Sequence, residues 1–427
     1  MKNIQIIVNY LVMVLGNPAF ILGIIALIGL VALKKSFSDV IKGTLKTILG
    51  FLILQAGAGV IVQALIPFSQ LFTAAFHFTG IVAEDNSLVA SVQQFLGIET
   101  ALIMVFSFII NLILAKFTKW KYIFLTGHMM FSFAGTMAIL FDQMGFGRMQ
   151  IIIFGSVVQG ICMVLFPAIS QPMVRKVTGN DNVAFGFWGS SLITFTGYIG
   201  GLLGDKKHST EDIKVSSKLD FLKDMSILMA IVMIIVYLVT AIFAGRENVL
   251  EITKQSSITS FSLMTALNFV AGILILLQGV RMFLGEIVPA FKGISEKIVP
   301  GAKPALDVPI FYSFAPIAVT IGFLSAMVGG IIVTFLSAFL PVTVLPSVIG
   351  LFFMGGAAGV FGNATGGRRG AVISGFLLGF LFSLIIALAY PLLDLSGYNI
   401  TGLWFASTDA ILVIIVIRAI GFIFGIR

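Results

Sequence analysis

Apolar runs of about twenty residues recur along almost the whole chain, and a helix needs a run of that length to cross a lipid bilayer. The sequence is 59% hydrophobic and only 10% charged, which leaves too few charges to cover a water-soluble protein of 427 residues. The runs are continuous rather than alternating, which disfavours a β-barrel. We therefore predict an all-α polytopic membrane protein with about ten or eleven transmembrane helices and re-entrant hairpins.

The predicted spans form two series. The first comprises Val12–Leu33, Ile48–Ile66, Leu96–Ala115, Tyr122–Phe141 and Ile151–Ser170. The second comprises Met225–Phe243, Phe261–Gly285, Ile310–Leu340, Leu345–Gly362, Val372–Pro391 and Ala410–Gly425. The long run Ile310–Leu340 indicates a tilted or broken element, and the glycine-rich run after Leu345 indicates a re-entrant one. Ala184–Gly204, with six glycines and basic residues on both flanks, also favours a re-entrant hairpin.

Basic residues gather in short loops, and this fixes the predicted orientation. The net charge of +8 comes from 26 Lys and Arg against 18 Asp and Glu. Cytoplasmic loops of membrane proteins are enriched in Lys and Arg, so the excess indicates membrane topology and not a nucleic-acid partner. The residues that mark cytoplasmic loops are Lys34, Lys35, Lys42, Lys46, Lys116, Lys119, Lys121, Arg175 and Lys176.

The residues that usually carry metal or covalent chemistry are few. Cys162 is the only cysteine and lies in an apolar run without a neighbouring base, while His77, His128 and His208 are scattered. We expect no metal, no cofactor, no disulfide within the chain and no catalytic residue. The sequence also lacks a nucleotide-binding domain, which excludes a self-contained ATP-driven pump.

The segment Gln278–Pro316 places charges and five prolines inside a chain otherwise built for lipid. Charged side chains at membrane depth usually face protein or water, and irregular backbone there lines a cavity. The segment therefore predicts a substrate pathway. Asp307 has two interpretations, as an acceptor for ligand hydroxyls or as the cap of a nearby helix. Arg281 and Glu286 are five residues apart, so they do not form an i,i+4 pair.

Two short sequences recur in the same order, which is typical of transporters with two related halves. LILQAGAGVIVQALIP at Leu52–Pro67 resembles LILLQGVRMFLGEIVP at Leu274–Pro289, and FSFAG at Phe131–Gly135 resembles YSFAP at Tyr312–Pro316. We predict a single membrane unit over residues 1–427. Its first repeat spans about 8–204, a cytoplasmic loop spans 205–224, and the second repeat spans about 225–427.

His128 follows a Thr-Gly break in LTGHMMFSFAG, beside a basic loop. A histidine there can donate and accept hydrogen bonds, which suits a polyhydroxyl ligand, or it can pack between helices. Gly57 lies in LQAGAG, where small residues either pack helices or expose backbone to a ligand. The run Gly355–Gly367 lacks the ending of a phosphate loop. It is interpreted as a packed hairpin, with Asn363 and Thr365 as polar candidates.

At these residues the chain resembles the ascorbate-type membrane subunit, component IIC, of the bacterial phosphoenolpyruvate-dependent sugar phosphotransferase system. The resemblance covers most of the chain. It is carried by five blocks in the same order, namely LKKSFSDVIKGTLKTILGFLILQAGAG at Leu33–Gly59, LTGHMMF at Leu125–Phe131, QGVRMFLGEI at Gln278–Ile287, FKGISEKIVPGA at Phe291–Ala302 and IFYSFAP at Ile310–Pro316.

The resemblance implies a homodimeric permease of inverted-repeat design in the bacterial inner membrane. In it a core domain carries substrate past a dimer-forming scaffold. A separate phosphorylated IIB protein, supplied by IIA upstream, is expected to phosphorylate the sugar, so this chain performs no catalysis on its own. The chain ends at Arg427 directly after its last apolar run, and we expect no fused IIA or IIB.

The resemblance also implies a substrate-binding set, and its members are only partly retained. Gly57, His128 and Asp307 match the family pattern, whereas Ser132, Phe187 and Trp188 depart from it. Two positions expected to hydrogen-bond ascorbate are thus aromatic, at Phe187 and Trp188. Such a change alters ligand preference, because a site matched to hydroxyls penalises unpaired groups. The expected substrate is ascorbate or a related small sugar or polyol.

Two other classes of function stay open. One is an ion- or proton-coupled sugar carrier in which Asp307 and Glu286 are the coupling carboxylates. The other is a non-transporting sensor with the same fold. Dependence of uptake on a IIB partner separates the first alternative from the permease, and sugar binding that weakens when Asp307 or His128 is replaced separates the second.

Overall fold

The computed structural model describes residues 18–76, 80–83, 85–212, 225–254, 257–297, 299–398, 400 and 402–423. The start of the predicted span Val12–Leu33, His77 and most of the predicted loop 205–224 lie outside these residues. The helices are α2 (Pro18–Ala32), α3 (Phe37–Phe76), α4 (Asp85–Phe117), α5 (Gly127–Gln143), α6 (Arg148–Thr178), α7 (Ser190–Leu203), α8 (Met225–Ala244), α9 (Arg246–Thr253), α10 (Ile258–Lys297), α11 (Pro309–Tyr312), α12 (Pro316–Leu336), α13 (Val348–Ala389) and α14 (Thr408–Ile423).

The fold is that of a helical, multi-span membrane protein, with fewer long spans than predicted. Within the described residues, six helices are long and apolar enough to cross a membrane: α3, α4, α6, α10, α12 and α13. A seventh is added if α8 and α9, bent by 111° against each other, are one broken span. The expected ten or eleven is higher for two reasons. Within the described residues, the predicted spans Tyr122–Phe141 and Ala410–Gly425 form helices of only 17 and 16 residues, α5 and α14, and the predicted spans Leu345–Gly362 and Val372–Pro391 both belong to α13.

The predicted span Ile310–Leu340 is broken, as its length indicates. It forms the short helix α11 and then α12, with the break between Tyr312 and Pro316. Proline has no N–H to donate within a helix and is well tolerated in the first turn, so Pro316 suits the start of the second piece. The predicted hairpin Ala184–Gly204 is instead a strand of two residues followed by α7.

Six short strands, absent from the all-α prediction, join the helices: β1 (Ile81–Ala83), β2 (Tyr122–Phe124), β3 (Ala184–Phe185), β4 (Lys303–Leu306), β5 (Val344–Leu345) and β6 (Leu403–Trp404). They form two parallel three-stranded sheets with the orders β5-β1-β6 and β2-β4-β3. Buried chain breaks must pair their backbone N–H and C=O groups inside the protein. Strand pairing provides this, and each sheet takes its central strand from one half of the chain and its outer strands from the other.

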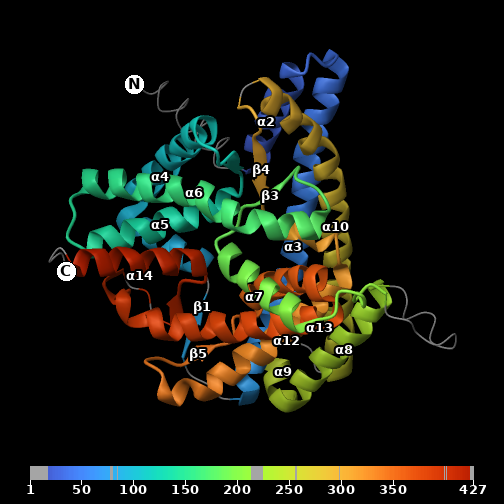
Figure 1. Ribbon diagram of the computed structural model, residues 1–427. Helices are drawn as coiled ribbons and strands as arrows, with labels where there is room; N and C mark the ends of the chain where they lie inside the picture. The colour runs from blue at the N-terminus through green and yellow to red at the C-terminus, as the bar shows by residue number, and fades with distance from the viewer. Residues whose placement is uncertain are drawn as a thin grey trace.

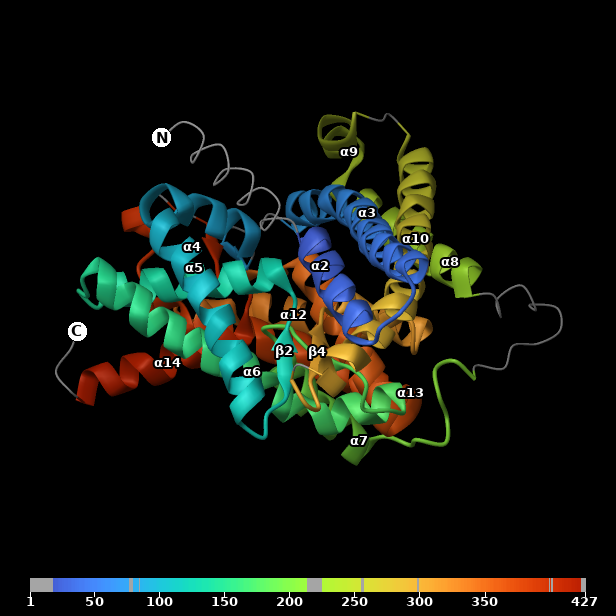
Figure 2. The same cartoon turned by 90° about the horizontal axis from the view of Figure 1, so that it is seen from above.

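The helices form two bodies, which Figures 1 and 2 show side by side. The long-helix body contains α2, α3, α8, α9 and α10, with α3 and α10 packed along each other. Both are 40 residues long, and each has a proline in its last third, Pro67 or Pro289. The sheet body contains both sheets with α4 to α7 and α11 to α14, and within it α12 and α13 make the most extensive contact.

Helix α13 is a hairpin. Its backbone leaves the helical region at Gly366 and Gly367, and Gly367 has a φ of 59°, which glycine adopts without strain. A Cβ atom on Gly362 would lie 2.3 Å from the Gly370 carbonyl oxygen. Residues eight apart in a straight helix are separated by about 12 Å, so the two arms fold back on each other. The arms correspond to the predicted spans Leu345–Gly362 and Val372–Pro391.

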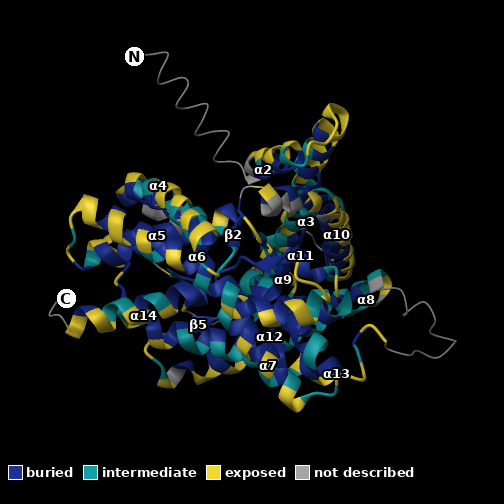
Figure 3. Cartoon of the chain, turned by 45° about the horizontal axis from the view of Figure 1, so that its top comes forward, coloured by how far each residue is buried: buried dark blue, intermediate teal, exposed yellow. Residues whose placement is uncertain are grey.

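Large apolar side chains cover much of the outer surface, as expected for a lipid-facing protein. Figure 3 shows exposed residues on the outward faces of the helices and buried residues around α12. On α4 the exposed apolar side chains include Val105, Phe106, Ile109 and Ile113, each 45% exposed or more. Their spacing of three to four residues places them on one face of the helix, which is the face we assign to lipid.

A charged cluster fixes the start of the sheet β2-β4-β3. Asp181, in the loop after α6, accepts hydrogen bonds from Arg175, Gln171 and Lys303. Burial alone would raise the pKa of Asp181, but the hydrogen bonds from Arg175, Lys303 and Gln171 outweigh it and lower this pKa to about 2. The carboxylate therefore ties the loop before β3 to the first residue of β4.

We predict that Asp181→Asn lowers the melting temperature at neutral pH, and only by a few degrees because half-exposed ion pairs contribute little. The pKa of Asp181 is lowered by folding, so its contribution is present above about 3.8 and is lost as pH falls towards about 2. Melting of detergent-solubilised wild type and variant at pH 7 and at about pH 2 measures this. An equal difference at both pH values would contradict it.

Candidate functional site

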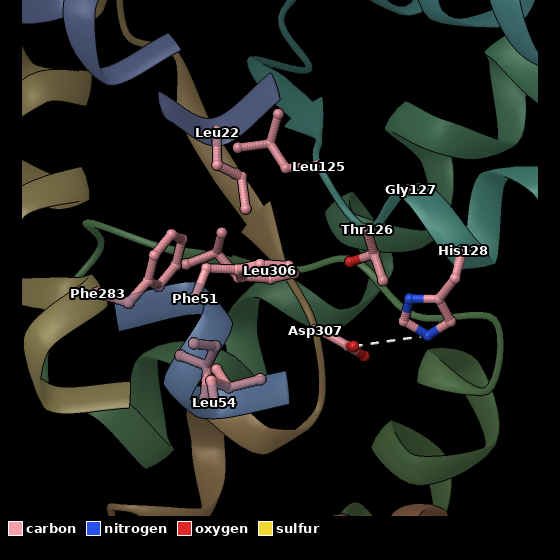
Figure 4. A pocket seen from close by; sticks show the side chains of 11 residues that line it. Leu22, Phe51, Leu54, Leu125, Thr126, Gly127, His128, Phe283, Leu306 and Asp307 are labelled. Carbon is pink, nitrogen blue, oxygen red and sulfur yellow. Dashed lines mark ion pairs between the residues drawn. The ribbon is translucent and has the colours of Figure 1, made fainter. Parts of the chain in front are cut away.

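A small cavity lies where the two bodies meet. From the long-helix body it is lined by apolar side chains of α2, α3 and α10, namely Leu22, Phe51, Leu54 and Phe283. From the sheet body it is lined by the turns that follow β2 and β4, with Leu125, Thr126, Gly127, His128, Leu306, Asp307 and Ile310. Figure 4 shows these residues around the cavity. The cavity thus has one apolar wall and one wall that carries polar groups.

The sheet brings the polar groups together. Strands β2 and β4 are parallel neighbours, with Tyr122 opposite Lys303 and Phe124 opposite Ala305. Their carboxyl ends therefore emerge side by side, and the Leu125 N–H extends the pairing to the Ala305 carbonyl at 3.0 Å. Ligands of open parallel sheets commonly bind at this edge. His128 and Asp307, separated by 179 positions in the chain, both lie just beyond it.

His128 and Asp307 face each other across the cavity (Figure 4). The distance from His128 Nε2 to Asp307 Oδ2 is 3.6 Å, longer than a direct hydrogen bond. The side chains are 47% and 21% exposed. Asp307 lies in the connection between β4 and α11. A ligand hydroxyl between the two side chains would gain a donor and an acceptor.

The two carboxylate oxygens of Asp307 have different neighbours, and these bear on whether Asp307 accepts ligand hydroxyls or caps a helix. Oδ1 accepts the Val308 N–H at 2.7 Å, and Val308 is the residue before the first turn of α11. Oδ2 faces His128. The carboxylate thus supports the chain at the start of α11 with one oxygen and presents the other to the cavity.

Thr126 is a polar residue of the cavity that the sequence reasoning did not single out. It is the N-cap of α5, but its side chain makes no capping hydrogen bond. Its hydroxyl oxygen is buried and has no hydrogen-bond partner among the residues that the structure describes. Buried hydroxyls are normally hydrogen-bonded, and the first N–H groups of a helix attract electronegative atoms. Its position two residues before His128, in the block Leu125–Phe131, is the sequence signal that could have identified it.

The other predicted site residues do not line the cavity. Gly57 lies between α3 and α10, where an added Cβ atom would be 2.3 Å from the Leu276 amide nitrogen. Ser132 is one turn beyond His128 on α5, and within the described part of the chain its buried hydroxyl has no hydrogen-bond partner. Phe187 stacks on Phe185 with ring centroids 6.0 Å apart.

Trp188 is fully buried next to this site. Its indole N–H donates to the Met129 carbonyl at 2.6 Å, and its ring stacks on Phe124 at 4.5 Å. His128, Asp307 and Thr126 therefore line one cavity in the structure. Gly57, Ser132, Phe187 and Trp188 lie in the packing around them.

The remaining candidates have structural partners. Glu286 forms an ion pair with Lys46 at 3.4 Å, between α10 and α3, which supplies the partner that the sequence did not identify. Asn363 accepts the Thr210 N–H at 2.8 Å, and Thr365 donates to the Gly197 carbonyl at 2.8 Å. These contacts hold α13 against the loop after α7 and against α7 itself. Among the described residues, no group of three or more His, Cys, Asp or Glu is arranged to hold a metal.

Comparison with known proteins identifies relatives of this chain. The family described as EIIC-GAT, PTS system sugar-specific permease component, matches residues 13–409. The ascorbate-specific PTS system EIIC component of Mycoplasma pneumoniae is 30% identical over 435 aligned residues. That alignment covers 89% of this chain and 66% of the relative, so the chain spans slightly less than two thirds of the relative's length.

We predict that Gly57→Val destabilises the protein by about 1–3 kcal/mol, since it forces a side chain into a filled contact. Gly59→Val is the matched control, because Gly59 lies on the same helix and has no atom within 4 Å of an added Cβ. The intrinsic cost of valine in a helix is the same at both positions. Melting temperatures in detergent measure the difference, and equal values for the two variants would contradict the packing role of Gly57.

Proposed function

The chain belongs to the EIIC-GAT family of PTS system sugar-specific permease components, and from this membership we propose that it binds a small sugar-like substrate at His128 and Asp307. The substrate crosses the bacterial cytoplasmic membrane with the sheet body, and a separate phosphorylated IIB protein phosphorylates it on the cytoplasmic side. Ascorbate or a related small sugar or polyol is the proposed substrate class.

The observation that carries this proposal is the pairing of two distant strand ends beside a cavity. His128 and Asp307 stand 3.6 Å apart, and the unpartnered hydroxyl of Thr126 lies in the same lining. A polyhydroxyl ligand needs several donors and acceptors at fixed positions, and histidine, carboxylate and hydroxyl groups supply both. Phe51, Leu54 and Phe283 offer an apolar surface to the carbon side of the ligand.

The cavity is too tight for a sugar in this conformation. The cavity has a volume of only about 20 Å³, and a single water molecule needs about 10–15 Å³. A sugar enters only if the α3 and α10 wall separates from the turns after β2 and β4. Relative movement of the two bodies therefore both opens the site and exposes it to one side of the membrane, which is alternating access.

The order of elements supports two repeats as the basis of this movement. The first half runs α3, β1, α4, β2, α5, α6, β3 and α7, and the second runs α10, β4, α12, β5, the two arms of α13, β6 and α14. The similar sequences Leu52–Pro67 and Leu274–Pro289 lie in α3 and α10, which occupy the same position in this order. We propose inverted repeats, with the long-helix body as the scaffold of a homodimer and the sheet body as the moving core.

The second pair of similar sequences, FSFAG and YSFAP, does not occupy equivalent positions in the two halves. Phe131–Gly135 lies in α5, whereas Tyr312–Pro316 joins α11 to α12. Helix α5 follows an outer strand of its sheet and α11 follows the central strand of that sheet. The two segments thus lie beyond neighbouring strands rather than at equivalent places in the two halves.

The ascorbate assignment rests on the relative's name and on the chemistry of the site. Trp188 and Phe187 do not line the cavity, so neither side chain would contact ascorbate bound there in this conformation. The polar contacts proposed for the substrate come from Thr126, His128 and Asp307. A carrier that couples Asp307 to Glu286 is less well supported, because Glu286 is paired with Lys46 and lies outside the cavity lining.

We predict that cells expressing this chain accumulate one phosphorylated compound only when the IIB partner is present. Uptake of labelled ascorbate, pentitols, hexitols and simple sugars, with and without IIB, measures this directly. Accumulation of an unmodified sugar in the absence of IIB would assign the chain to the ion-coupled carriers instead.

We predict that Asp307→Asn weakens substrate binding by about tenfold or more, since hydrogen bonds to charged groups contribute about 1.5–3 kcal/mol. The control is Asp205→Asn, which breaks another His–Asp pair, because Asp205 Oδ2 lies 2.9 Å from His208 Nδ1 in the loop after α7. Binding to purified protein measures both. Similar affinities for wild type and Asp307→Asn would remove Asp307 from the site.

A further inference from the structure

A buried carboxylate from the last helix completes the start of α7. The N-cap of α7 is Gly189, which has no side chain with which to cap the helix. An added Cβ atom there would lie 2.5 Å from Met354 Cε and 3.0 Å from the Phe187 ring, so a larger residue would require the Met354 side chain to move. The first N–H groups of a helix have no partners within it. The acceptor for α7 must therefore come from elsewhere in the chain.

Asp409 is that acceptor. It lies on α14, is fully buried, and reaches the first turn of α7 from 219 positions along the chain. Its Oδ2 accepts the Ser190 N–H at 3.0 Å and the Ser190 hydroxyl at 3.1 Å, and its Oδ1 accepts the Ser191 N–H at 3.3 Å and the Ser191 hydroxyl. Four donors and a helix N-terminus stabilise a negative charge that burial alone would disfavour.

The residue before this cap is Trp188, and it connects the cap to the candidate site. The Asp409 N–H also points to the Trp188 carbonyl, at 3.4 Å. The Trp188 indole N–H donates to Met129, in the first turn of α5, and its ring stacks on Phe124, the last residue of β2. Phe124 and Met129 bracket the turn that carries Thr126 and His128, so one indole ring contacts both ends of that turn.

We propose that Asp409 is a positioning residue for the candidate site. Its carboxylate fixes the N-terminus of α7, the N-terminus fixes Trp188, and Trp188 holds the turn from Phe124 to Met129 in the geometry that directs His128 towards Asp307. Asp409 touches no substrate in this scheme. The C-terminal helix α14 thereby contributes to substrate affinity from outside the cavity. This inference deepens the proposed function and rests on it for the binding readout.

Asp409→Asn tests whether the Asp409 carboxylate acts on the candidate site through Trp188, because the change keeps the shape of the side chain and removes its charge. We measure labelled ascorbate binding and Trp188 fluorescence in a protein that carries Trp120→Phe and Trp404→Phe, which leaves Trp188 as the sole tryptophan. Loss of a helix cap predicts about tenfold weaker binding, together with a shifted Trp188 emission maximum.

The control is Asp142→Asn. Asp142 accepts the Tyr398 hydroxyl at 2.6 Å and also joins an early helix to the C-terminal part of the chain, but it lies at the far end of α5 from His128. It should change neither readout. Unchanged emission or unchanged affinity in Asp409→Asn would overturn the positioning role, and so would an equal effect in Asp142→Asn.

Two further outcomes are informative. If Asp409→Asn fails to reach the membrane, Ser191→Ala replaces it, because that change removes one of the four donors and leaves the carboxylate in place. A smaller shift in the same direction then supports the proposal, and no shift overturns it. If the wild-type chain binds none of the sugars tested, the proposed function fails, and the Trp188 emission alone decides whether Asp409 controls the indole.

Discussion

Unpaired backbone polar groups are costly at membrane depth, and this constraint determines how the chain interrupts its helices. Wherever a helix stops inside the protein, the freed N–H and C=O groups need partners that lipid does not provide. The chain meets this need with strands of two to four residues that pair across the two halves. Strand pairing satisfies the backbone at these breaks, and the polar side chains of the candidate site lie at the same breaks.

The parallel arrangement of the strands has a further effect. Parallel neighbours end at the same edge, so the turns after β2 and β4 are adjacent although their residues are far apart in sequence. His128, at the start of α5, and Asp307, in the connection after β4, are brought together by the pairing of the strands that precede them. The long-helix body lines the same cavity with Phe51, Leu54 and Phe283. The polar groups and the apolar wall opposite them thus come from different bodies.

His128 and Asp307, whose local chemistry is unusual, line the cavity in the structure, whereas the other predicted site residues do not. His128 and Asp307 were identifiable because a titratable group beside glycine or proline is rare in an apolar chain. Trp188 was interpreted as a ligand contact, but an aromatic side chain beside a glycine-rich break looks the same whether it faces a cavity or a core. Gly57 was ambiguous for a similar reason, since small residues serve close helix contacts and ligand contacts alike. The strands were missed because two to four apolar residues carry no periodicity.

The exchange of strands between the halves has a consequence for how the protein is made. Strand β1 is synthesised early, but both of its sheet neighbours, β5 and β6, belong to the second half, and β2 and β3 have no central strand until β4 is made. Neither half can complete the backbone hydrogen bonds of these sheets alone. We therefore expect both sheets to close only after the second half of the chain has been made.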